Sequence, residues 1–154
     1  MLSRASKYAI LSTLYLALHS SKDNKTRVNL IAEKLDVPSP FLAKLFQQLV
    51  RGKVISSTKG PRGGFYLSDD NSTKTVCDII VTIDGRNKLD DCFLGLDECD
   101  ESQPCPVHFI VANFKEGLFG KFRDKTIVEF AKEAEDSGRF LTLKNTILKT
   151  DEGK

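Results

Sequence analysis

Residues 59–64, with the sequence Lys-Gly-Pro-Arg-Gly-Gly, constrain the fold of this chain more than any other segment. They lie between two short stretches of β character, 54–57 and 65–67, and their glycines and proline are typical of a tight turn. Lys59 and Arg62 make this turn basic, and the glycines allow the backbone to approach another backbone closely. The segment therefore predicts a short β-hairpin with a positively charged tip.

Three predicted helices precede this hairpin, over residues 3–19, from about 26 to 35, and over 39–51. The third helix has one apolar face, with residues at spacings of three and four: Leu42, Leu45, Phe46, Leu49 and Val50. We expect Thr26 and Ser39 to be the N-caps of the second and third helices. Three short helices followed by a hairpin is the order of a winged helix-turn-helix, so the predicted fold is mainly α with a small β-hairpin.

The outer face of the third helix and the hairpin tip are the candidate contacts to double-stranded DNA. Lysine and glutamine can donate to base edges or phosphates, and glutamine can read adenine with two hydrogen bonds. The candidate DNA-binding residues are Ser39, Phe41, Lys44, Gln47, Gln48, Lys59 and Arg62. The same element order occurs in protein-interaction modules. However, residues 1–70 hold eleven Lys/Arg and five Asp/Glu, a net charge of +6, which favours a polyanionic partner.

The second half of the chain is acidic and predicts a sensor loop and a dimerisation helix. A fourth helix is predicted over 75–84, a long irregular loop over 86–105, a helix from Pro106, and a further helical stretch from about Asp124. The helix from Pro106 has an apolar stripe expected to form a homodimer: Val107, Val111, Phe114, Leu118 and Phe122. We divide the chain into a winged helix-turn-helix (1–70), a fourth helix with sensor loop (71–105), a dimerisation region (106–136) and a tail (137–154).

Three of the four cysteines lie in the loop before the dimerisation helix. Cys92, Cys99 and Cys105 are followed by His108, and thiolate and imidazole are ligands for soft metals. This spacing favours a metal site or a redox switch, and it differs from that of paired zinc knuckles. The surrounding loop is acidic, which we expect to raise the pKa of the thiols. Cys77 falls within a helical pattern and is expected to be a buried core thiol.

The sequence resembles the Rrf2 family of bacterial winged-helix transcription regulators. The resemblance rests on residues 6–9 (Ser-Lys-Tyr-Ala), residues 41–46 (Phe-Leu-Ala-Lys-Leu-Phe), the turn with its following Phe-Tyr-Leu, and the cysteine loop. It implies a homodimer that crosses through the helix after the loop and binds a palindromic operator. It also implies a [2Fe–2S] or [4Fe–4S] iron–sulfur cluster, which an aerobic preparation can lose, on Cys92, Cys99 and Cys105, with His108 as the fourth ligand.

The predicted function is that of a DNA-binding transcriptional repressor which senses iron–sulfur status, redox state or nitric oxide. The alternatives are a thiol- or zinc-switched repressor and a regulator that acts by docking to another protein. We expect no enzyme activity, since the chain has no positioned acid–base pair outside the cysteine loop. No apolar run approaches the ~20 residues of a membrane span, so we expect a cytoplasmic protein without a membrane partner.

Overall fold

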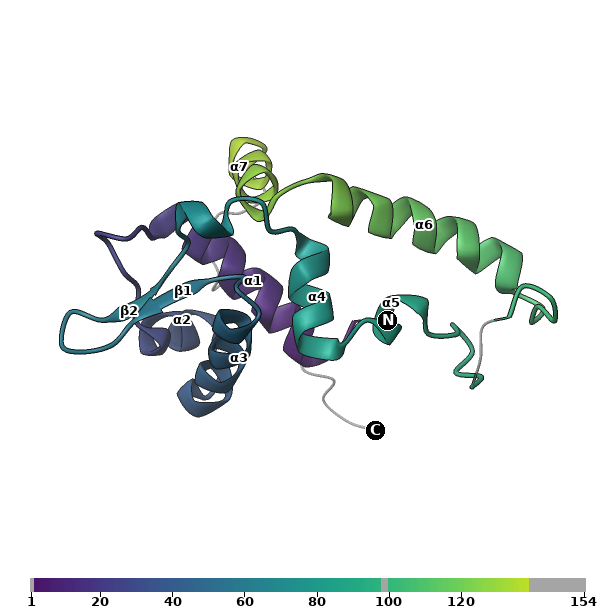
Figure 1. Ribbon diagram of the computed structural model, residues 1–154, viewed down its shortest axis with the longest axis horizontal. Helices are drawn as coiled ribbons and strands as arrows, with labels where there is room; N and C mark the ends of the chain where they lie inside the picture. The colour runs from purple at the N-terminus through teal and green to yellow at the C-terminus, as the bar shows by residue number, and fades with distance from the viewer. Residues whose placement is uncertain (1, 98–99, 139–154) are drawn as a thin grey trace.

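The computed structural model describes residues 2–97 and 100–138. A helical body carries a two-stranded antiparallel hairpin, which confirms the predicted fold class. The body contains α1 (Arg4–His19), α2 (Val28–Leu35), α3 (Ser39–Arg51), β1 (Ser56–Thr58), β2 (Gly64–Tyr66) and α4 (Val76–Asp84). The hairpin projects from one end of this body, and a long helix extends from the other end (Figure 1). We call residues 56–66, the two strands and their turn, the wing.

Helix α1 is the central helix of the body. The Ser3 hydroxyl caps its first turn by accepting a hydrogen bond from the Ser6 N–H at 3.0 Å. Ser12 and Thr13 are fully buried, and each hydroxyl donates to the carbonyl four residues earlier in the same helix. Because these hydroxyls are satisfied within α1, the helix can be surrounded by apolar residues of its neighbours.

Helix α2 and helix α3 form the helix-turn-helix, but both begin differently from the prediction. The backbone of Thr26 exchanges two hydrogen bonds of 2.9 Å with Phe65, so Thr26 pairs with the wing, and Arg27 is the N-cap of α2. Pro38 is the N-cap of α3, and Ser39 lies in its first turn. The predicted caps are therefore wrong. For Thr26 the reason is a long-range bridge, which helix-capping preferences do not include.

The strands of the wing lie one or two residues away from their predicted positions. Val54 and Ile55, predicted to open the first strand, are almost completely buried in the core below it. The pairing begins with Ser56 opposite Tyr66 and ends with Thr58 opposite Gly64. The apolar pair anchors the hairpin, and the polar residues that follow it form the ladder.

Helix α4 matches its predicted ends: Thr75 forms a capping box with Asp78, and Gly85 ends the helix. The predicted loop 86–105 contains a short helix, α5 (Asn87–Asp90). The next helix, α6 (His108–Asp124), begins two residues after the predicted start at Pro106.

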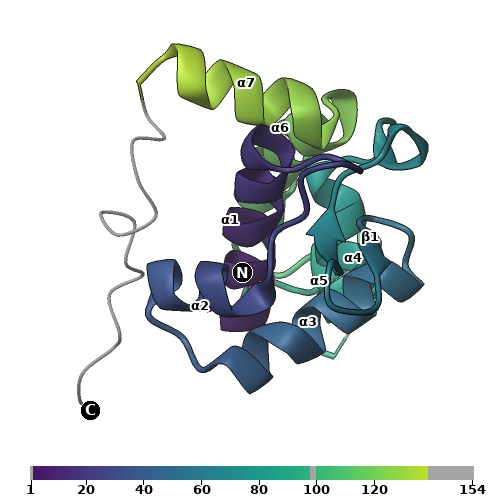
Figure 2. The ribbon, with the colours of Figure 1, turned by 90° about the vertical axis from the view of Figure 1, so that its left-hand side faces the viewer.

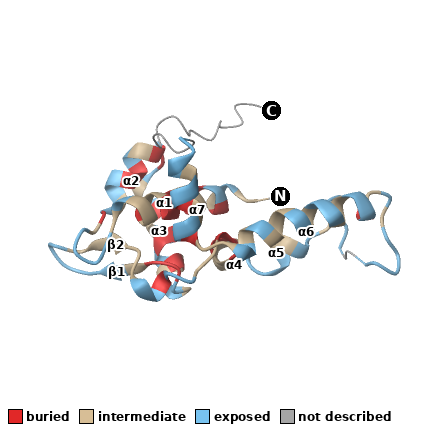
Figure 3. Cartoon of the chain, turned by 90° about the horizontal axis from the view of Figure 1, so that it is seen from above, coloured by how far each residue is buried: buried red, intermediate tan, exposed pale blue. Residues whose placement is uncertain are grey.

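Helix α6 extends away from the body, and α7 (Ile127–Asp136) returns the chain to α1 (Figure 1). The buried residues are concentrated in the body, whereas α6 is exposed or half-buried along most of its length (Figure 3). The backbone N–H of Ile127 donates to the Lys74 carbonyl at 2.8 Å, and Ile127 and Ala131 are buried. Helix α7 therefore packs on the body, whereas α6 extends away from it; we call α6 the arm. Within the described residues, no helix has the length and apolar character to cross a membrane.

Candidate DNA-binding surface and cysteine site

Helix α3 has a buried side and a polar outer side. Leu42, Leu45, Phe46 and Leu49 are buried in the core, as predicted from their spacing. On the outer side Lys44 and Gln47 are exposed, and Ser39 and Gln48 are half-buried. Phe41 is 38% exposed, and its ring meets the edge of Tyr8 at a centroid distance of 6.1 Å. The outer side thus combines one cation, amides and an aromatic ring on a rigid support.

The tip of the wing presents Lys59 and Arg62 on an exposed turn. Gly60 has a φ of +101°, which L side chains rarely adopt. At Gly63, a Cβ atom would lie 2.2 Å from the carbonyl oxygen of Thr58, so the turn has no space for any side chain there. These glycines hold the two cations at the end of a closed hairpin.

The wing is fixed to the helix-turn-helix by a ring contact, a bridge and a hydrogen bond. Phe65 packs edge-on against Phe46 of α3 with ring centroids 4.8 Å apart. Thr26 pairs with Phe65, as described above, and the Arg27 Nη2 donates to the Pro61 carbonyl at 2.6 Å. The view onto this side of the body shows α2, α3 and the wing together (Figure 2). The two predicted contact elements therefore belong to one rigid unit.

Two basic residues of this surface were missed in the sequence analysis. Lys25 lies over the Tyr66 ring, with its Nζ 5.8 Å from the ring centre, and Arg27 contacts the wing tip. Both lie in the segment between α1 and α2, which has no periodic pattern. In the sequence, only their positive charge indicated that they could belong to this surface. Their position could not be inferred, because it depends on the long-range Thr26–Phe65 bridge.

Cys92, Cys105 and His108 line one cavity of about 410 Å³ between the loop and α6. Cys92 follows α5, Cys105 precedes α6, and His108 is the first residue of α6. The His108 N–H donates to the Cys105 carbonyl at 3.0 Å, which places both residues at the same helix end. Cys99, the third predicted thiol ligand, lies outside the described residues.

Backbone N–H groups surround the sulfur of Cys92. Hydrogen bonds from the N–H of Leu96 and then of Leu94 lower the pKa of this thiol, with smaller contributions from Cys105 and Gly95. The expectation that the acidic loop raises the thiol pKa is therefore wrong for Cys92, because the hydrogen bonds from the amides of its own turn outweigh the desolvation that opposes ionisation. A thiolate held by amides is the form that binds metals and reacts with oxidants.

The donor types at this cavity fit a soft metal or an iron–sulfur cluster, since thiolate and imidazole are their usual protein ligands. Among the described residues, no three Cys, His, Asp or Glu side chains converge closely enough to hold a metal ion by themselves. Cys77 is buried in α4, as expected, and its Sγ lies 3.7 Å from the Phe119 carbonyl oxygen. Burial raises the pKa of the Cys77 thiol, so its chemistry differs from that of Cys92.

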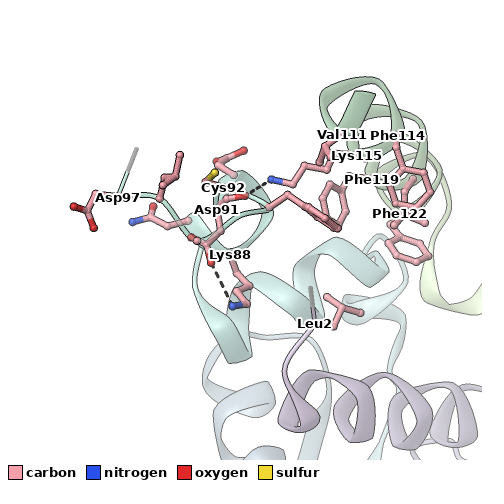
Figure 4. A pocket seen from close by; sticks show the side chains of 16 residues that line it. Leu2, Lys88, Asp91, Cys92, Asp97, Val111, Phe114, Lys115, Phe119 and Phe122 are labelled. Carbon is pink, nitrogen blue, oxygen red and sulfur yellow. Dashed lines mark hydrogen bonds and ion pairs between the residues drawn. The ribbon is translucent and has the colours of Figure 1, made fainter. Parts of the chain in front are cut away.

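A second cavity, of about 720 Å³, also lies between the cysteine loop and α6 (Figure 4). Its apolar wall comes from one side of α6 and includes most of the predicted stripe: Val111, Phe114, Leu118 and Phe122. Lys115 extends from α6 toward the loop between these residues (Figure 4). The most exposed apolar residues of α6 are Ile110, Phe109 and Phe114, at 76%, 67% and 58%. The stripe therefore faces the loop, and Phe114 joins it to the more exposed surface of Phe109 and Ile110.

A helix-turn-helix with an attached basic wing defines a winged-helix protein. The family model described as "Iron-dependent Transcriptional regulator" matches residues 2–133. The chain belongs to this family, Rrf2, whose members are transcriptional regulators. It is therefore a DNA-binding transcriptional regulator and not an enzyme.

Similar proteins carry related names. A protein of Aquifex aeolicus named as an HTH-type transcriptional regulator is 36% identical over 123 residues, 79% of this chain and 84% of the relative. IscR of Photobacterium profundum is 27% identical, over 99% of this chain and 90% of that protein. The fold resembles CymR, "the Global Cysteine Regulator of B. subtilis", with a TM-score of 0.70 at 18% identity, over 86% of this chain and 97% of CymR. It also resembles "T. potens IscR", with a TM-score of 0.64 at 20% identity, over 89% and 90%.

Proposed function

We propose that this chain is a cytoplasmic, homodimeric repressor whose binding to DNA depends on an iron–sulfur cluster. The observation that carries the proposal is the single cavity lined by Cys92, Cys105 and His108 at the start of α6. The relatives named IscR and the family description support an iron-linked signal. The division of the chain into winged domain, sensor loop, dimerisation region and tail is part of the same proposal.

The ligands we assign are Cys92, Cys99, Cys105 and His108, for a [2Fe–2S] or [4Fe–4S] cluster. When bound, such a cluster supplies one-electron redox chemistry and reactivity toward oxygen or nitric oxide. The N–H groups of Leu96 and Leu94 favour the thiolate of Cys92, which is the ligating form. His108 is buried at the end of α6 farthest from the body, so a ligand there ties the loop to α6 (Figure 1).

The second candidate is a repressor switched directly by its thiols or by zinc. The observation that favours it is the contact between the Cys92 and Cys105 thiols, because a thiolate beside a second thiol can form a disulfide. The fold similarity to CymR, including an oxidised form from Staphylococcus aureus, makes this candidate worth testing.

The dimer is proposed to form through α6. Phe109, Ile110 and Phe114 expose a contiguous apolar surface on the arm, away from the body's own core. A surface of this kind on a water-soluble chain is typical of an interface. A two-fold dimer presents two winged domains, so the operator is expected to be an imperfect palindrome with two half-sites.

In each half-site, α3 is proposed to enter the major groove and the wing to contact the backbone or the minor groove. Lys44, Gln47 and Gln48 are assigned to base edges, Phe41 to a thymine methyl group, and Ser39 to the phosphate at the start of α3. Lys59 and Arg62 are assigned to phosphates beside the groove.

Anaerobic purification followed by absorption spectroscopy and iron, sulfide and zinc analysis tests this function. We expect visible absorption with iron and sulfide in the wild type. We expect both to be lost in Cys92→Ala and Cys105→Ala and kept in Cys77→Ala, the matched control on α4. Zinc without sulfide would support the second candidate, and a metal-free protein that forms a Cys92–Cys105 disulfide with hydrogen peroxide would support the thiol switch.

A further inference from the structure

Lys115 forms a polar link between the arm and the cysteine loop. Its Nζ donates a hydrogen bond to the backbone carbonyl of Asp91, the residue immediately before Cys92 (Figure 4). This carbonyl belongs to the same planar peptide unit as the N–H of Cys92. A bond to the carbonyl therefore restrains the orientation of the peptide that carries the cysteine.

Asp91 is held from the other side as well. Its N–H donates to the Asn87 carbonyl at 2.8 Å, and its carboxylate lies 3.3 Å from the Nζ of Lys88. Both contacts are within α5 and its flank, so they fix Asp91 to the loop itself. The Lys115 bond differs because it connects this fixed point to another element, α6.

The packing around this link is sparse. Cavities of about 720 and 410 Å³ lie between the loop and α6, and Lys115, Cys92 and Phe93 line both of them. Phe93, Leu94 and Leu96 of the same turn are more than half exposed. Because few side chains fill the space between the loop and α6, one hydrogen bond accounts for a large share of their connection.

On α6, Lys115 lies near both the proposed cysteine site and the proposed dimer surface. It lies two helical turns after His108, so both residues are on one side of the helix. Its neighbour Phe114 belongs to the exposed apolar surface. A displacement of Asp91 would therefore pull on Lys115 and so act on α6, the helix that carries the proposed dimer surface.

We propose that Lys115 is a positioning residue that couples the cysteine loop to α6. Through this coupling, a change in the conformation of the loop changes the conformational dynamics of α6. The inference rests on the proposed function, because it gives the cysteine site a physical route to the dimer. Lys115 acts through the Asp91–Cys92 peptide, whose carbonyl accepts its hydrogen bond.

The first test uses the metal-free protein and hydrogen–deuterium exchange. In Lys115→Met the amides of Asp91 and Gly95, which donate to Asn87 and Cys92 carbonyls, should exchange about tenfold faster, as expected for loss of one charge-assisted bond. Lys115→Arg keeps a cationic donor and should restore slow exchange. Lys121→Met, an exposed position on the same helix, is the matched control and should match the wild type. Equal exchange in Lys115→Met and the wild type would overturn the inference.

The second test uses protein reconstituted anaerobically with ferrous iron and sulfide. In the wild type, cluster binding should slow exchange in the loop and in α6. In Lys115→Met the visible spectrum should persist, and the effect should remain in the first turn of α6, which His108 ties to the cluster, but be lost in the turns around Lys115 and beyond. If α6 responds equally in both proteins, the inference fails and the proposed function stands. If the wild type retains neither iron nor sulfide, the proposed function fails, and the coupling to a cluster fails with it.

Discussion

At the scale of single residues, Gly63 determines whether the wing can close. A Cβ atom there would lie 2.2 Å from the Thr58 carbonyl oxygen, and backbone cannot move aside as a flexible side chain can. We predict that Gly63→Ala lowers the free energy of unfolding by about 2 kcal/mol and weakens DNA binding. Thermal unfolding and a DNA-binding assay measure the two effects. Gly117→Ala, where nothing lies within 4 Å, is the control and should not lower stability.

Arg62 is the residue at which the role of the wing is tested most simply. Its side chain is exposed at the tip, so removing it should leave the fold intact. We predict that Arg62→Ala weakens DNA binding for all sequences alike and lowers the slope of log K against log salt by about one. Lys132→Ala on α7, another exposed cation, should leave the slope unchanged. An unaltered slope in Arg62→Ala would mean that the wing does not contact DNA.

Asp84 links the end of α4 to the start of α1 and makes stability depend on pH. Burial opposes ionisation, but hydrogen bonds from the Ser3 hydroxyl and N–H outweigh it and hold the pKa of Asp84 below its usual value. The folded state then binds fewer protons than the unfolded state near that pKa. This contribution is therefore present above about pH 4, the usual value of an unfolded Asp, and is lost as pH falls through the folded value.

We predict that Asp84→Asn is less stable than the wild type at pH 7 and that the difference shrinks below about pH 4. Urea unfolding at several pH values measures it. Asp23→Asn, in the exposed loop after α1, is the control and should match the wild type throughout. A constant difference between Asp84→Asn and the wild type across this range would contradict the assignment.

At the scale of elements, the sequence predicted those whose ends depend on local chemistry. The apolar stripe of α3 and the approximate ends of α4 were correctly inferred from neighbouring residues. The start of α2 was wrong because Thr26 pairs with Phe65, which lies far away in the sequence. The strands were misplaced because Val54 and Ile55 are apolar for burial in the core and not for strand pairing.

The cysteine site shows the same limit. The residue types Cys92, Cys105 and His108 indicated a common site, and they line one cavity. The lowered pKa of Cys92 could not be inferred from composition, because the acidic side chains are visible in the sequence and the amide directions are not. Lys115 was overlooked for a similar reason: it reaches the loop from the next helix.

Helix α6 carries the prediction for the dimer. Ile110 is its most exposed apolar residue, whereas Leu118 is half-buried beside the cysteine loop and would disturb that loop if replaced. We predict that Ile110→Asp is monomeric at micromolar concentration with an unchanged helix content. Sedimentation and circular dichroism measure these properties. Asn113→Asp, an exposed change to the same charged residue on α6, should remain dimeric. A wild-type monomer would rule out the interface.

At the scale of the whole molecule, the cysteine loop and the wing lie at opposite ends (Figure 1). The cysteine loop lies along α6, and α7 packs against α1, the central helix of the winged body (Figure 1). In the proposed dimer through α6, the loop lies close to the interface. The relative positions of the two α3 helices then depend on how the two α6 helices pack against each other. A change at the loop can therefore alter the distance between the two DNA-reading helices without altering either of them.

The central claim is that occupancy of the cysteine site changes DNA binding. The most direct measurement compares anaerobically reconstituted wild type with the Cys92→Ala/Cys99→Ala/Cys105→Ala variant on one duplex, selected from a random pool with the reconstituted protein. We predict the same fold and dimer in both, but a difference of at least about tenfold in affinity, which corresponds to roughly 1.4 kcal/mol. Equal affinities, with the cluster confirmed in the wild type, would contradict the claim.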